Sequence, residues 1–101
     1  MRVFVSYTTK DPTITIEKLK LVENYINTRA RVFIDKLHNN NGGQLRVNYE
    51  LCRSNVVLHL ISNKYKSKWV DKELSVARKK KKILVEIKID KLLNRHYRCR
   101  L

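Results

Sequence analysis

Asn55-Val-Val-Leu-His-Leu-Ile61 is the stretch that decides the fold, because it is apolar at nearly every position. A half-exposed strand alternates apolar and polar residues, whereas a strand covered on both faces is apolar almost throughout. We therefore expect a central strand here, with helices on both sides of it. Three further short apolar runs with β-branched residues predict strands. They lie at residues 3–5, 31–34 and 83–89.

Between these runs the apolar residues recur at helical spacing. This periodicity predicts helices over residues 11–27 and 44–53, and a third that Ser67 can cap. Asp11 is the expected cap of the first helix, with Pro12 at its first helical position. Strands that alternate with helices predict an α/β fold with an open parallel sheet of about four strands and helices on both faces.

Length and composition indicate one globular domain. The chain has 101 residues and no Gly/Pro/Ser-rich linker, so we expect a domain over residues 1–89 and a basic tail over 90–101. No segment approaches the ~20 apolar residues of a membrane span, and the N-terminus is typical of a strand rather than a signal peptide. We therefore expect a cytoplasmic protein with no membrane partner. Cys52 and Cys99 are too isolated for a disulfide scaffold or a metal site, and we expect free thiols, with Cys52 in a helix core.

The chain is strongly basic, with 23 Lys and Arg against 9 acids and a formal net charge of +14. The charge is dense at residues 78–82 and 96–100. Such a surplus attracts polyanions, so nucleic acids, nucleotides and anionic surfaces are candidate partners. A solubilising surface is an equally good interpretation. No helix-turn-helix, RRM or OB pattern accompanies the charge, which argues against specific nucleic-acid binding.

Ser67-Lys-Trp-Val-Asp-Lys-Glu73-Leu74 carries the candidate chemistry. Trp69 and Glu73 are four residues apart on the predicted helix and share one face. Ligands of open α/β sheets bind beyond the carboxyl ends of the strands, where the loops at 6–11, 35–43 and 62–68 would gather. Taken by themselves, the residues favour structural roles: a surface carboxylate at Glu73, paired with Lys72 or Arg78, and a core position for Trp69.

Four pieces of the chain follow one another in a recognisable order. They are Val3-Phe-Val-Ser-Tyr7 with Asp11, Val32-Phe-Ile-Asp35 before Gly42-Gly43, the strand from Ser54 to Ser62, and Tyr65-Lys-Ser-Lys-Trp-Val-Asp-Lys-Glu-Leu74. Together they cover roughly residues 2–89, and in this order the chain resembles the Toll/interleukin receptor (TIR) domain family and its bacterial relatives. Family members usually add another strand and helix after the fourth strand, where this chain has only its basic tail, so the resemblance is to a truncated TIR-like fold.

The resemblance implies a flavodoxin-like sheet and, for the enzymatic branch of the family, cleavage of NAD+ between nicotinamide and ribose. Glu73 matches the catalytic glutamate that follows a tryptophan by four residues. Substrate-binding roles are implied for Trp69 and for the loop residues Ser6, Tyr7 and Lys10. The segment from Asp35 to Gly43, including Gly42, matches the family's self-association loop. NAD+ would be the substrate, with no further cofactor and no metal, in immune or antiviral signalling.

Cleavage of the bond between nicotinamide and ribose needs only one carboxylate. Loss of nicotinamide, a neutral leaving group, builds positive charge on the ribose, and a fixed carboxylate stabilises that charge more than it stabilises the ground state. The Trp69 ring can hold the cationic pyridinium by a cation–π contact of about 0.5–2 kcal/mol. Lys10, Arg31 or Lys36 could meet the pyrophosphate. The main alternative function is a non-catalytic TIR interaction module.

Overall fold

The computed structural model describes residues 1–39 and 41–100, with the backbone alone for residues 95–100. Four strands form one sheet: β1 (Arg2–Ser6), β2 (Arg31–Phe33), β3 (Val56–Leu60) and β4 (Ile83–Ile87). All neighbouring strands are parallel, and their order is β2-β1-β3-β4. The predicted α/β fold with an open, flavodoxin-like parallel sheet is therefore confirmed.

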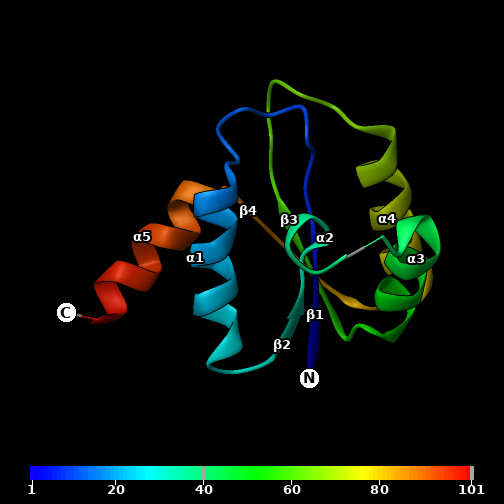
Figure 1. The fold of residues 1–101 in the computed structure, drawn as a ribbon, viewed down its shortest axis with the longest axis horizontal. Coiled ribbons are helices and arrows are strands. Elements are labelled where there is room, and N and C mark those ends of the chain that lie inside the picture. Colours follow the sequence, from blue (N-terminus) through cyan, green and yellow to red (C-terminus); the bar gives the residue numbers. More distant parts are fainter. Residues whose placement is uncertain (40, 101) are drawn as a thin grey trace.

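Helices cover both faces of the sheet (Figure 1). On one face lie α1 (Ile16–Asn27) and α5 (Ile89–Arg100), and on the other lie α3 (Gly43–Arg53) and α4 (Lys68–Lys79). A short helix, α2 (Asp35–His38), follows β2 within the segment expected to be a loop. Each face has its own apolar cluster, because successive side chains of a strand point to opposite faces.

The first helix begins later than predicted. Asp11 does not cap it: the Asp11 carboxylate accepts hydrogen bonds from the backbone N–H and the hydroxyl of Thr13, at 2.9 and 2.7 Å. Aspartate forms such turns with residues two positions on, and this turn competes with helix formation. Thr15 is the actual N-cap, since its hydroxyl accepts from the backbone N–H of Lys18 at 3.2 Å.

The structure also places Cys52 and the segment after β4. Cys52 is exposed rather than in a helix core, because Val47 and Leu51 form the buried side of α3. Cys99 lies outside the residues whose side chains are described. The segment after β4 forms α5, whose Leu92 and Leu93 are buried in the cluster shared with α1.

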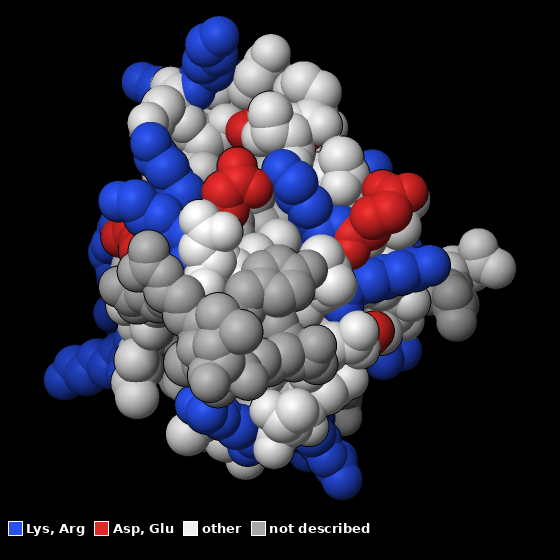
Figure 2. Space-filling view, turned by 90° about the vertical axis from the view of Figure 1, so that its left-hand side faces the viewer, with Lys and Arg blue, Asp and Glu red and all other residues white. Residues whose placement is uncertain are grey.

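On the α1 and α5 side, the charged side chains that the structure describes are dispersed. Figure 2 shows Lys and Arg around the periphery of this side, with Asp and Glu between them. One basic side chain of the 78–82 run has a structural role, since the Lys82 ammonium donates to the carbonyls of Cys52 and Ser54 at 3.0 and 2.6 Å. Among the described residues, no helix is long and apolar enough to cross a membrane.

Candidate functional site

Helix α4 presents Glu73 to the carboxyl end of β1. Ser67 caps the helix, and its apolar stripe of Val70, Leu74 and Ala77 is buried against the sheet. Glu73 projects beside this stripe and is half-buried. The sequence-based alternative of an ion pair with Lys72 or Arg78 is not what the structure shows: the carboxylate is bonded to a serine of the sheet instead.

That serine is Ser6, the last residue of β1. Its hydroxyl donates to the Glu73 carboxylate at 2.8 Å, and Ser6 itself is 1% exposed. A buried hydroxyl with one acceptor within reach holds that acceptor in one orientation. The two residues are 67 positions apart in sequence, so only the fold brings them together.

Burial raises the pKa of Glu73 from 4.5 to about 7. The hydrogen bond from Ser6 acts in the opposite direction, because it stabilises the ionised form, and the negative charge of Asp35 raises the pKa further. Glu73 is therefore close to half ionised at neutral pH. A carboxyl group whose pKa lies near the working pH is typical of sites that perform acid or base chemistry.

Tyr7 lies beside Glu73 and is held in its protonated form. Burial raises its pKa to about 12, and the charges of Asp35 and Glu73 act in the same direction. The Tyr7 hydroxyl accepts a hydrogen bond from the backbone N–H of Lys36 at 3.3 Å, which ties the end of β1 to α2. Tyr7 therefore adds a neutral hydroxyl to the site.

These side chains line a hollow of about 220 Å³. It is formed by ends of β1, α2 and α4 together with part of α3, and its polar walls include Tyr7, Asp35, Ser67 and Glu73. Pockets that enclose a drug-sized ligand usually measure ~300–1,000 Å³. This hollow accordingly has room for one end of a dinucleotide, and the other end would extend outside it.

Trp69 stands at the rim of the hollow and is 60% exposed, so it is not a core residue. The Lys72 ammonium lies 5.6 Å from the centre of its ring, a cation–π distance. A second hollow, of about 150 Å³, adjoins the first and shares Gln44, Trp69 and Glu73 with it. The indole is thus accessible, and it already contacts a cation.

The basic residues predicted to bind the pyrophosphate do not line the hollow beside Glu73. Lys10 is exposed and is not among the residues that line the hollow. Arg31 begins β2, at the far end of the sheet from Glu73, so it cannot join a phosphate bound in this cleft. Lys36 follows the carboxyl end of β2, and its backbone already contacts Tyr7. Of the three basic candidates, Lys36 is the best placed.

The segment from Asp35 to Gly43 is organised by Asn39. The Asn39 amide donates to the Asp35 carboxylate at 2.7 Å and to the Gly43 carbonyl at 3.0 Å. Gly43 has a φ of +58°, a conformation that favours glycine, and a side chain at Gly42 would meet Asn39 and Arg46 at about 2.5 Å. The local backbone and packing therefore explain why both positions are glycine, independently of any role of the segment in self-association.

The two histidines outside the tail make protein contacts. His59 is hydrogen-bonded to Glu86 on the neighbouring strand at 3.0 Å. His38 accepts a hydrogen bond from the Ile34 backbone N–H at 2.8 Å and also contacts Glu23. Within the described parts of the chain, no cluster of three His, Cys, Asp or Glu side chains could hold a metal ion.

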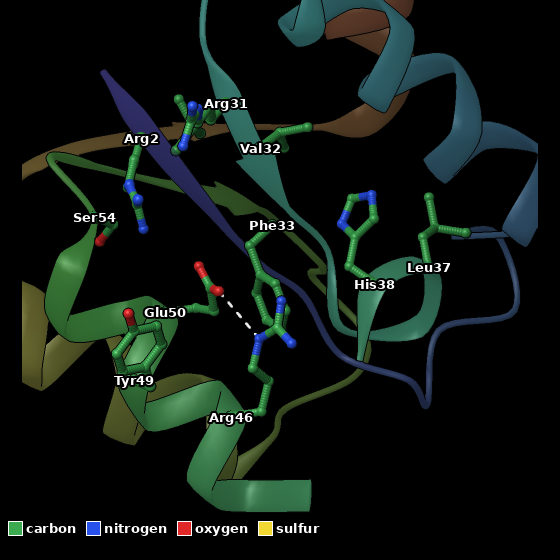
Figure 3. A pocket seen from close by; sticks show the side chains of 11 residues that line it. Arg2, Arg31, Val32, Phe33, Leu37, His38, Arg46, Tyr49, Glu50 and Ser54 are labelled. Carbon is green, nitrogen blue, oxygen red and sulfur yellow. Dashed lines mark hydrogen bonds and ion pairs between the residues drawn. The ribbon is translucent and has the colours of Figure 1, made fainter. Parts of the chain in front are cut away.

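Sequence reasoning did not find another hollow, which is larger than the Glu73 cleft. It measures about 650 Å³ and runs along β2, from the starts of β1 and β2 to α2, with one side of α3 as its other wall (Figure 3). A signal was present, because Arg2 directly precedes one predicted strand and Arg31 begins another, and the starts of parallel strands meet at one edge. Gln44 and Thr9, which line the Glu73 cleft, were also missed.

No protein-family model matches the chain, and searches of curated proteins and of solved structures also found no match. Any functional conclusion therefore depends on the chemistry of the cleft itself.

Proposed function

We propose that the chain is a TIR-type NAD+ nucleosidase or cyclase, which cleaves the bond between nicotinamide and ribose and depends on self-association for activity. One observation carries the proposal. Glu73 is a half-buried carboxyl group with a pKa of about 7, oriented by Ser6 and placed beside an exposed indole at the carboxyl end of a parallel sheet. Ligand sites of such sheets lie at this end.

The proposed reaction needs one carboxylate. The bond between C1 of the ribose and the pyridinium nitrogen breaks, and nicotinamide leaves with the bonding electron pair as a neutral base. Positive charge then develops on the ribose, where ionised Glu73 stabilises it. Water completes hydrolysis and releases a proton, whereas attack by the adenine of the same molecule gives the cyclic product. Binding of a cationic ring favours the ionised form of Glu73, because an opposite charge lowers the pKa of a carboxyl group.

Trp69 supplies the contact to the pyridinium. The Lys72 ammonium lies 5.6 Å from the centre of the Trp69 ring, so the electron-rich face of the ring is accessible to a cation. A bound pyridinium would displace the Lys72 side chain, which is exposed and therefore free to move. The nicotinamide and ribose would occupy the 220 Å³ hollow, and the adenosine half would lie across the surface near α2.

The test compares nicotinamide release from NAD+ by the wild type, Glu73→Gln and Glu17→Gln at high protein concentration, where self-association is favoured. Glu73→Gln keeps an oxygen to accept from Ser6 but removes the charge, so we expect its rate to fall by about 10²–10³-fold. Glu17 is exposed on α1 and serves as the matched control. We expect the wild-type rate to increase with pH through about 7 and then to level off. Background rates for all three proteins would overturn the proposal.

A second candidate function is a non-catalytic interaction module. It is favoured by large apolar side chains on α3, next to the proposed self-association segment: Leu45 is 83% exposed and Tyr49 is 52% exposed. Apolar groups exposed together often mark a binding surface. A Leu45→Lys variant that loses self-association while nicotinamide release stays at background in every variant would favour this module over the enzyme.

A further inference from the structure

The 650 Å³ hollow at the starts of β1 and β2 has the size of a ligand site. Its two strand arginines lie at the other end of the sheet from Glu73, and it shares no lining residue with the Glu73 cleft. Figure 3 shows Arg2 and Arg31 on its strand side and Tyr49, Glu50 and Arg46 on the α3 side, facing each other across open space.

Arg2 and Arg31 are register partners on neighbouring parallel strands. Their side chains therefore leave the sheet on the same face and lie next to each other, as the close view shows (Figure 3). Within the described part of the chain, neither guanidinium has a hydrogen-bond or ion-pair partner. Two positive side chains without a counter-charge therefore line the same hollow.

The opposite wall does not neutralise them. Glu50 is the one carboxylate among the lining residues, and it is paired with Arg46 at 3.0 Å. The Arg46 guanidinium is also fixed over the ring of Phe33, 5.6 Å from its centre. Three arginines against one glutamate leave the hollow with two net positive charges.

Guanidinium groups bind phosphate and carboxylate oxygens through paired N–H donors. Two adjacent guanidinium groups in a hollow with two net positive charges match a dianion. A phosphate group is a dianion, whereas a single carboxylate is not. We propose that the hollow binds the phosphate or diphosphate group of a small phosphorylated molecule between Arg2 and Arg31. The remainder of the ligand lies along α3 toward Tyr49, since the cavity is larger than the anionic group needs.

Calorimetric titration with inorganic pyrophosphate and with ADP tests the site. We expect saturable binding of both to the wild type, with ADP at least as tight, and a loss of at least about tenfold in Arg2→Gln and Arg31→Gln. Lys20→Gln removes the same charge from the exposed side of α1 and should bind like the wild type. Glu50→Gln should bind pyrophosphate more tightly, because it removes a repelling carboxylate and releases Arg46.

Absence of saturable pyrophosphate binding, or an equal loss in Arg31→Gln and Lys20→Gln, would overturn the proposal. Arg31 is exposed, so its variant should fold even if Arg2→Gln does not, and circular dichroism checks this. The variants that test the site, Arg2→Gln and Arg31→Gln, leave every lining residue of the Glu73 cleft in place. The result therefore does not depend on whether the cleft at Glu73 cleaves NAD+.

Discussion

Glu73 links the candidate site to the stability of the fold. Its pKa is about 7 in the folded chain against 4.5 as the ordinary value, so the folded state disfavours ionisation. The protonated carboxyl group of Glu73 therefore contributes to the unfolding free energy. This contribution is fully present below pH 4.5 and is lost as the pH rises through about 7. The shift corresponds to about 2–3 kcal/mol after allowance for partial exposure.

We therefore predict that the unfolding free energy decreases between pH 5 and pH 8 by about 2–3 kcal/mol more in the wild type than in Glu73→Gln. Urea denaturation at a series of pH values measures this difference. Glu17→Gln controls for the loss of one surface charge and should follow the wild type. Parallel curves for the wild type and Glu73→Gln would show that Glu73 is not desolvated.

Ser6 has the opposite influence on the same carboxyl group. Its hydroxyl stabilises ionised Glu73, so Ser6→Ala should move the pKa of Glu73 upward by about one pH unit. The carbon-13 chemical shift of the Glu73 carboxyl group, followed against pH, reports this directly. Asp35→Asn should move it downward, because Asp35 raises the pKa. Shifts in the reverse directions would contradict the described geometry.

Among the elements, α1 shows how a local contact overrides a sequence signal. Thr15 rather than Asp11 caps the helix. Loss of a capping hydroxyl costs ~1 kcal/mol, so Thr15→Ala should lower the unfolding free energy by about that amount, whereas Thr15→Ser should retain most of it. Thermal or urea denaturation distinguishes the two. A larger loss in Asp11→Ala than in Thr15→Ala would restore Asp11 as the cap.

The sequence predicts the strands and the shared face of α4 well, because both follow from short-range periodicity. Trp69 and Glu73 share one face of α4 as predicted, beside the buried stripe Val70, Leu74 and Ala77. Contacts between distant segments could not be predicted. The bond from Ser6 to Glu73 and the structural contacts of Lys82 depend on the strand order and register, which no local pattern encodes.

The solvent exposure of single side chains was also not predicted correctly from the sequence. Taken without the family resemblance, the residues favoured a core position for Trp69, and the packed helix shows instead that it lies at the rim. Cys52 was misplaced because a small apolar residue one position beyond Leu51 was assigned to the buried face of α3. Arg31 was assigned to the wrong end of the sheet because its strand position was not used.

On the scale of the whole molecule, charge opposes self-association. Strand β4 lies at the edge of the sheet, with Ile83 and Val85 at 61% and 43% exposure. Lysines precede and follow this strand in sequence, and edge lysines discourage pairing between sheets. The formal charge of +14 adds a general repulsion between copies.

We therefore predict that self-association increases with ionic strength. At about 1 M salt the Debye length is about 3 Å, compared with about 10 Å at 0.1 M, so repulsion between copies is screened. Sedimentation velocity at both salt concentrations measures the effect. Val85→Lys should abolish association through the edge of β4, and Leu45→Lys should abolish association through α3. Weaker association at high salt would instead indicate attractive ion pairs between copies.

The strand order also sets how the backbone exchanges its hydrogens with heavy water. Strands β1 and β3 have hydrogen-bonded neighbours on both sides, whereas β2 and β4 have one each. Amide protons of doubly flanked strands exchange only when most of the molecule opens. Deuterium uptake should therefore be slowest in β1 and β3. Ser6 and Arg2 are the two ends of β1, so both hollows are anchored on a strand that is among the last parts of the chain to unfold.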